Sequence, residues 1–336
     1  MANTSIATSH NLTNEQWEAS LYKTYQEKTF FSKFKGVGQG SVVQVKRDLI
    51  KKPGDAITFG LSDTIRGTSG VTGNTPIEGT VGTGADSAYQ SNYEAMSFYD
   101  QRVVIDQVRQ AIKISGIMDE KRVAFSMRNE AKDKLVDWMS YNEDQALFTA
   151  LQTADTVGTV ASGSTIDLDG GLTYDNIVDM KKEAMFPTTG NIDGTATTRK
   201  LEPIRVDGGE EVFVLIANPA DCASFRKSDD FKNFNQNADV RGSSNAIFTG
   251  MLGKFNNVVI HEHSSITAGK PVLVGANALF LAYGKEIMYG EDTFDYSNQT
   301  GFMIGSIRGV ALAKFEDQSD NSQGSHGAIV FDLTTE

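Results

Sequence analysis

The segment that decides the fold is IMDEKRVAFSMRNEAKDKLVDWMSYNEDQALFTALQ, residues 117–152. It contains neither glycine nor proline, the two residues that most disfavour a helix interior. Asp119 and Glu120 lie at its start, where negative charge complements the positive end of the helix dipole. One apolar stripe follows at helical spacing, formed by Val123, Met127, Ala131, Leu135 and Trp138. We expect a single unbroken helix about 54 Å long, which serves as a spine for the other elements.

An aromatic arm precedes this helix near the N-terminus. Thr13 can cap a first helix, and Gln16 completes a capping box. Large apolar side chains follow within a short stretch: Trp17, Leu21, Tyr25, Phe30 and Phe31. Two interpretations are open, because the arm can pack on its own body or clamp a neighbouring molecule. The second interpretation predicts that removing residues 1–34 leaves a folded body that cannot assemble normally.

Residues 42–114 are expected to form a long excursion from the body. Val43, Val45 and Leu49 alternate with polar residues, which is the period of a strand with one buried face. Strand-like sequence returns over residues 93–114, after a stretch rich in glycine and threonine at 67–84. The pattern favours an extended hairpin over a disordered linker. Basic residues near its first strand are solvated surface or form salt bridges between subunits: Lys46, Arg47, Lys51 and Lys52.

A mixed section of helices and strands follows a polar linker at residues 154–172. Thr173 starts a helix that cannot continue through Pro187, and Asn218-Pro219 reads as the cap and first turn of another. The second of these helices carries Cys222, the single cysteine, which we expect to be a small buried residue. Short apolar runs predict buried strands: Val212 to Ile216, Val258 to Ile260, Val272 to Val274, Ala278 to Tyr283, Phe302 to Phe315 and Ala328 to Leu333.

The composition excludes several classes of protein. The 336 residues are 39% hydrophobic and 22% charged, which is typical of a globular chain. Acidic residues number 43 against 31 basic ones, and the formal charge of −12 disfavours non-specific binding to phosphate backbones. A single cysteine excludes an internal disulfide. No stretch approaches 18 consecutive apolar residues, so no membrane span is expected, and a cytoplasm is the simplest place of synthesis.

The sequence offers little catalytic chemistry. His261, Glu262 and His263 lie at the end of an expected strand, where alternation places both histidines on one face, as in some metal sites. The competing interpretation is a solvated strand end. Gly36, Gly38 and Gly40 lack the preceding buried strand and following helix of a nucleotide-binding loop. We therefore predict no catalytic residue, no cofactor and no metal site.

Taken in order, these elements resemble the major capsid protein of tailed bacteriophages. Local strings also fit that family: LYKTYQEKTFFSKF at 21–34, IKKPGDAITFGL at 50–61 and VLVGANALFLAYGKE at 272–286. The chain is most similar to the coat proteins of short-tailed phages, without a large cleaved N-terminal scaffolding segment. The resemblance implies an α+β fold in five parts: an N-terminal arm at 1–41, an extended β-hairpin loop and its base at 42–114, a spine helix and linker at 115–169, an axial domain at 170–265 and the strands of a peripheral domain at 266–336.

The same resemblance implies a structural function. Copies of the chain would form hexamers and pentamers of an icosahedral head shell that encloses double-stranded DNA without sequence-specific binding. Expected partners are a portal protein, a separate scaffolding protein and a decoration protein, with assembly in the host bacterial cytoplasm and the virion as final location. The aromatic residues of the arm and the four basic residues of the loop are the expected inter-subunit contacts. Two rivals are another self-assembling subunit, of a surface layer or tail tube, and a metal-dependent enzyme that uses His261 and His263.

Overall fold

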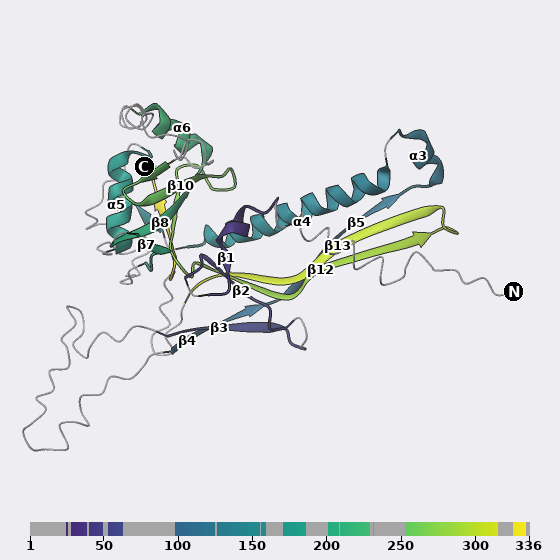
Figure 1. The fold of residues 1–336 in the computed structure, drawn as a ribbon, viewed down its shortest axis with the longest axis horizontal. Helices are drawn as coiled ribbons and strands as arrows, with labels where there is room; N and C mark the ends of the chain where they lie inside the picture. The colour runs from purple at the N-terminus through teal and green to yellow at the C-terminus, as the bar shows by residue number, and fades with distance from the viewer. Residues whose placement is uncertain are drawn as a thin grey trace, which may run out of the picture.

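The structure, a computed structural model, describes most of the chain in segments. These are residues 25, 28–38, 40–49, 53–62, 98–124, 126–154, 156–158, 171–185, 201–207, 209–228, 231, 253–314 and 325–333. Two parts are visible in Figure 1: an elongated sheet with a helix along it, and a mixed body at one end. The elongated sheet extends away from the mixed body along the long axis of the view.

The elongated part is a five-stranded sheet in the order β1-β2-β12-β13-β5. Its centre is a long antiparallel hairpin of β12 (Leu279–Phe294) and β13 (Gln299–Leu312). β5 (Asp106–Ile114) pairs with the outer edge of β13, while β2 (Val43–Lys46) runs parallel to the start of β12. The short β1 (Lys35–Gly36) completes the sheet beside β2. Strands far apart in the sequence therefore meet along one sheet.

The prediction of a single unbroken spine helix is wrong in one respect, because two helices form and the break lies near the start of the segment. A short helix α3 (Ile117–Arg122) ends at Val123, whose backbone is extended at φ −103° and ψ 140°. The long helix α4 (Met127–Leu151) begins after Ser126, whose side chain accepts a hydrogen bond from the Asn129 amide at 3.4 Å. A serine at the N-cap position favours the start of a new helix. The β-branched side chain of Val123 favours extended backbone.

Only part of the expected hairpin is found among the described residues, because β2, from its expected first arm, belongs to the long sheet. β3 (Ala56–Ser62) pairs antiparallel with β4 (Phe98–Val104) in a two-stranded sheet. Phe59 stacks on Phe280 at 4.3 Å between ring centroids, which joins this hairpin to the long sheet. The strand expected over 93–114 is divided, since its second half is β5 and belongs to the long sheet. The glycine-rich stretch at 67–84 lies outside the described residues.

The mixed body contains a second sheet, in the order β6-β14-β11-β8-β10-β9, with β7 also beside β8. Its strands are β6 (Thr156–Gly158), β7 (Arg205–Asp207), β8 (Glu210–Ala217), β9 (Gly253–Phe255), β10 (Val258–Glu262), β11 (Val272–Val274) and β14 (Ala328–Asp332). β8 is buried on both faces, because Phe213 and Leu215 enter one hydrophobic cluster while Val214 and Ile216 enter another. The continuous apolar run of the sequence is thereby explained.

Two helices cover part of this body. α5 (Tyr174–Met185) buries Ile177, Met180 and Ala184, as the sequence predicts. α6 (Pro219–Lys227) starts at Asn218, whose side-chain oxygen accepts from the Ala220 amide at 2.9 Å, which confirms the expected cap. Cys222 is buried on this helix, and burial raises the pKa of its thiol to about 12. It is therefore a packing residue, as expected, and not a reactive thiol.

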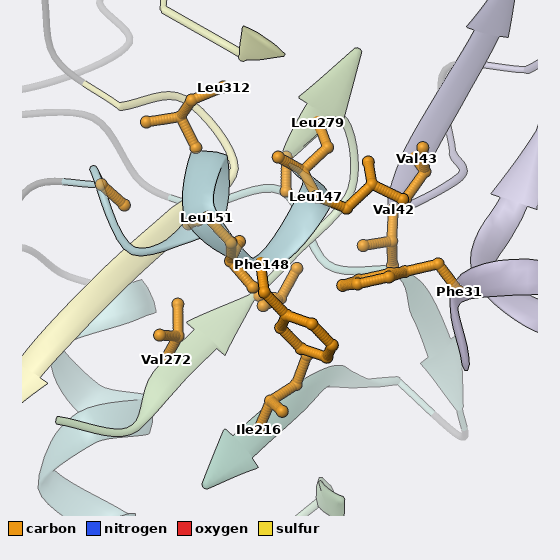
Figure 2. Close-up of a cluster of buried hydrophobic side chains, with 14 of the residues drawn as sticks. Phe31, Val42, Val43, Leu147, Phe148, Leu151, Ile216, Val272, Leu279 and Leu312 are labelled. Carbon is orange, nitrogen blue, oxygen red and sulfur yellow. The ribbon is translucent and has the colours of Figure 1, made fainter. Parts of the chain in front are cut away.

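The junction of the two parts is a hydrophobic cluster, drawn in Figure 2, that we call the junction core. The last turns of α4 supply Leu147, Phe148 and Leu151 to it. The 3₁₀ helix η1 (Phe30–Phe34) adds Phe31 from the N-terminal side. Both sheets contribute the remaining residues, which include Val43, Leu279, Leu312, Ile216 and Val272. One apolar cluster thus holds the helix, both sheets and the N-terminal segment together.

Truncating Phe31, which the N-terminal segment contributes to the junction core, should reduce the stability of the fold strongly. Phe31 is completely buried, so Phe31→Ala should lower the free energy of unfolding by about 3–5 kcal/mol. Chemical unfolding of the unassembled subunit measures the loss. Val37→Ala is the matched control, because Val37 is 73% exposed and should change stability by less than about 0.5 kcal/mol. Equal effects of the two substitutions would contradict the packing described here.

Candidate subunit-contact residues and a buried charge cluster

Part of the aromatic arm packs on the chain's own body. Tyr25 is 2% exposed and Phe31 is fully buried, while Phe30 packs against the junction core. The Phe30 and Phe31 amides donate to the carboxylate of Asp144 on α4, at 2.8 and 3.4 Å. Of the two interpretations left open by the sequence, own-body packing holds for these three residues. Trp17 and Leu21 lie outside the described residues.

This packing changes how the arm should be tested. A deletion of residues 1–34 would remove Phe31 from the junction core and would destabilise the body itself. The expectation that such a chain stays intact conflicts with the structure. A deletion that ends at residue 24 keeps Tyr25 and all of η1.

Glu143 on α4 is the centre of a buried charge cluster. Its carboxylate pairs with the Arg308 guanidinium of β13 at 3.1 Å and accepts from the Tyr283 hydroxyl of β12 at 2.8 Å. The Lys35 ammonium and the Tyr25 hydroxyl, both from the N-terminal segment, also contact this carboxylate. Glu143 has no exposed surface, and Arg308 is 4% exposed. Three other segments of the chain therefore converge on this carboxylate of α4.

Burial dominates the electrostatics of this cluster. It raises the pKa of Glu143 to about 7, although the positive charge of Arg308 opposes the shift. Burial also lowers the pKa of Lys35 to about 8. The neighbouring Asp144 has a raised pKa for the same reason, opposed by the Phe30 and Phe31 amides. A carboxylate in such surroundings needs its cation, because an unpaired buried charge is costly.

Sequence reasoning missed this cluster. The apolar stripe through Ala131 and Leu135 continues at the same spacing to Met139, Glu143 and Leu147, all of which are buried. A carboxylate within a buried helical stripe is the signal that could have found it. Its partners Tyr283 and Arg308 come from strands more than a hundred residues later, and no local pattern identifies them.

The basic residues of the loop have partners within the chain where they are described. The Lys46 ammonium donates to the Thr58 carbonyl at 2.8 Å and lies 4.8 Å from the centroid of the Phe59 ring. Arg47 forms an ion pair with Glu286 of β12. The Lys46 contacts join the β3–β4 hairpin to β2 of the long sheet, and the Arg47 ion pair joins the end of β2 to β12. Lys51 and Lys52 lie outside the described residues, so a role of this segment between subunits stays a prediction.

The histidine pair lies in an aromatic cluster. His261 is buried beside Phe34, with ring centroids 5.4 Å apart, and His263 stacks on Phe148 at 4.2 Å. Burial lowers the pKa of His261 to about 4, and Lys33 adds to the shift. The expected solvated strand end is therefore wrong for His261. No three metal-ligating side chains gather in the part of the chain that the structure describes.

Glu262, between the two histidines, forms an ion pair with Arg226 of α6 at 2.7 Å. His263 accepts a hydrogen bond at Nδ1 from the Ser265 amide at 3.2 Å. Both residues are thus engaged in local contacts that hold the strand end in place. Within the described ranges, no helix is both long and apolar enough to cross a membrane.

The charge cluster predicts a pH-dependent effect of Arg308→Leu. The positive charge of Arg308 lowers the pKa of Glu143 and so opposes the effect of burial. Without the guanidinium, this pKa should rise above about 7. A raised carboxyl pKa contributes stability below the unfolded value of 4.5, and that stability is lost as the pH rises through the folded value. We expect a loss of about 3–5 kcal/mol at pH 8 and a clearly smaller loss at pH 5, measured by chemical unfolding.

Arg226→Leu is the control for this experiment. Arg226 and Glu262 form a partly exposed pair, whose removal should cost about 0–1 kcal/mol at either pH. Equal losses for Arg308→Leu at pH 5 and pH 8 would contradict the account of Glu143.

The chain is similar to capsid proteins of several phages. Residues 5–159 match the family model described as phage capsid protein. The major capsid protein of Pseudomonas phage KPP25 is 24% identical over 90% of this chain and 91% of its own length. The capsid of Ralstonia phage GP4 shares the fold over 100% of this chain and 99% of its own, at 23% identity and a TM-score of 0.68. The capsid of Helicobacter pylori bacteriophage KHP30 covers 91% of this chain and 92% of its own, at 15% identity and a TM-score of 0.69. The chain is thus similar in sequence to phage capsid proteins, and it shares the fold of a phage capsid over nearly its whole length.

Proposed function

We propose that this chain is the coat subunit of a phage head and that its copies assemble as hexamers and pentamers into a closed icosahedral shell. The observation that carries the proposal is a fold shared over the whole chain with the capsid subunits of other phages. A closed shell needs many identical copies in heterologous contacts that close on themselves. Each contact can be weak, since many act together.

The shape of the subunit supports this role. The long sheet and α4 extend far from the mixed body, and the β3–β4 hairpin packs beside the near end of the long sheet (Figure 1). We propose that the mixed body meets its copies at the centres of hexamers and pentamers, as the axial domain expected at 170–265 would. The long sheet would then point toward neighbouring capsomers, and the excursion at 42–114 would reach an adjacent subunit.

The charge of the chain is consistent with a container and not with a DNA-binding wall. With a formal charge of −12, the subunit lacks the excess of basic residues that grips phosphate backbones. We propose that it encloses double-stranded DNA without sequence-specific binding. Portal, scaffolding and decoration proteins are its proposed partners, and the host cytoplasm is the proposed place of assembly.

Electron microscopy of the expressed chain, with sedimentation of the same sample, tests this function. Closed shells, or rings of five or six subunits, are the expected products, with a scaffolding protein of the phage co-expressed where the chain alone stays unassembled. Flat sheets or open tubes would instead favour a surface layer or tail tube. A chain that remains monomeric at high concentration under both conditions would contradict the proposal.

A second prediction concerns the arm. Deleting residues 1–24 keeps Tyr25, Phe31 and Lys35, so the thermal midpoint of the unassembled subunit should change by no more than about 2 °C. We expect the shell yield to fall at least about tenfold, because Trp17 and Leu21 would no longer reach a neighbour. A Trp17→Ala, Leu21→Ala double variant should reproduce the loss. Normal shells from both variants would remove the arm from the assembly contacts.

A further inference from the structure

We propose that the contact between η1 and the end of β10 is a pH-sensitive switch, which releases η1 from the mixed body on acidification. The switch consists of rings that we call the histidine cluster: Phe30 and Phe34 of η1, Phe148 of α4, His261 of β10 and His263 directly after it. The histidine cluster lies within a single subunit. The inference therefore goes beyond the proposed function and does not depend on it.

The rings of the histidine cluster pack together across three elements. His263 stacks on Phe148, and its ring centroid lies 4.9 Å from that of Phe30. His261 meets Phe34 edge-on, with the ring planes at 89°, and its centroid lies 6.1 Å from that of Phe30. Both histidines therefore face apolar rings, where a charged imidazolium is less well solvated than in water. Their neutral forms hold η1 against the mixed body.

The hydrogen bond of His263 requires a neutral ring. Its Nδ1 atom accepts from the Ser265 amide at 3.2 Å. An imidazole nitrogen accepts a hydrogen bond only while it carries no proton, and both nitrogens of an imidazolium are donors. Protonation of His263 on Nδ1 therefore breaks this bond and places two donors opposite each other.

The charged groups around the histidine cluster favour neutral histidines. Lys33 brings a positive charge from η1 and helps to lower the pKa of His261. The carboxylate of Glu262, on β10, is paired with Arg226 of α6 at 2.7 Å. The carboxylate of Asp144, on α4, accepts two backbone amides of η1. The carboxylates that these neighbouring elements supply are thus engaged in other contacts, while the positive charge of Lys33 repels a protonated His261.

Acidification weakens this contact. Burial lowers the pKa of His261 from 6.5 to about 4, and it lowers the pKa of His263 as well. A histidine with a lowered pKa contributes stability above pH 6.5, and that stability is lost as the pH falls toward the folded value. His261 alone should favour the release of η1 by up to about 30-fold at pH 5 relative to pH 7.5. The raised pKa of Asp144 acts in the opposite direction, so the test compares variants that differ at the histidines.

The other contacts of this region confine the opening to η1. Gln145 of α4 donates from its side chain to the Ser265 hydroxyl at 2.6 Å, which ties the helix to the mixed body without a titrating group. Tyr25 and Lys35, on either side of η1, contact the carboxylate of Glu143. These contacts hold α4 and the flanks of η1 in place while the rings of η1 separate from the histidines.

Hydrogen exchange of the unassembled subunit measures the release, because backbone amides of η1 exchange when η1 opens. Peptides that cover residues 28–36 are compared at about pH 7.5 and about pH 5, after correction for the intrinsic exchange rate. On acidification, protection should fall at least about fivefold more in the unchanged chain than in a His261→Phe, His263→Phe double variant, whose rings cannot bind a proton. The strand β13 should show the same pH dependence in both proteins.

A matched pair of lysine variants tests the same switch with both histidines in place. Lys33→Gln removes the positive charge that lowers the pKa of His261, so the pH response of η1 should become smaller. Lys28→Gln removes a lysine of the same segment that pairs with Asp137, and it should leave the size of the response unchanged.

Equal pH responses of the unchanged chain and the double histidine variant would overturn the switch. If the double variant does not fold, equal responses of the two lysine variants would overturn it. Both measurements use unassembled subunits, so neither result bears on the proposed function, which the formation of shells tests separately.

Discussion

The burial of the last turns of α4 between two sheets is the packing interaction on which the rest of the subunit depends. Leu147, Phe148 and Leu151 are fully buried in one cluster with Phe31 and residues of both sheets (Figure 2). Each side chain of this size contributes about 1.5–3 kcal/mol on burial. Because these residues belong to one cluster with strands of both sheets, the helix end helps to fix how the long sheet meets the mixed body. Rigid positioning of these parts is what a regular shell requires from every copy.

Apolar packing alone would not fix the N-terminal segment in one register. Apolar contacts tolerate small shifts, whereas the Glu143 carboxylate needs Tyr283, Arg308 and Lys35 at particular positions. A buried ion pair of this kind adds little stability over an apolar replacement, and its removal from one side is costly. The cluster therefore specifies where the N-terminal segment crosses α4. The junction core supplies the apolar burial that holds the N-terminal segment against the body.

The elements were largely predictable from local sequence, and their long-range pairings were not. The apolar run of β8, the Asn218 cap and the stripe of α4 each carry a local signal that the structure bears out. The break before α4 was missed, although Ser126 is an ordinary N-cap residue. The division of residues 93–114 into β4 and β5 depends on two different partner strands. The same limit applies to the site, since Glu143 is satisfied by residues that no local pattern connects to it.

The structure also bears on which parts of the chain can make contacts between copies. Tyr25, Phe30 and Phe31 are held against α4 and the junction core, so their apolar surface is used within the subunit. Lys46 and Arg47 likewise have partners in the same chain. Surfaces that keep large apolar side chains exposed, such as those of Met118, Tyr141 and Tyr296, are better placed to meet a neighbour. Because the side chains that build the core are buried within one chain, contacts between copies must come from other residues.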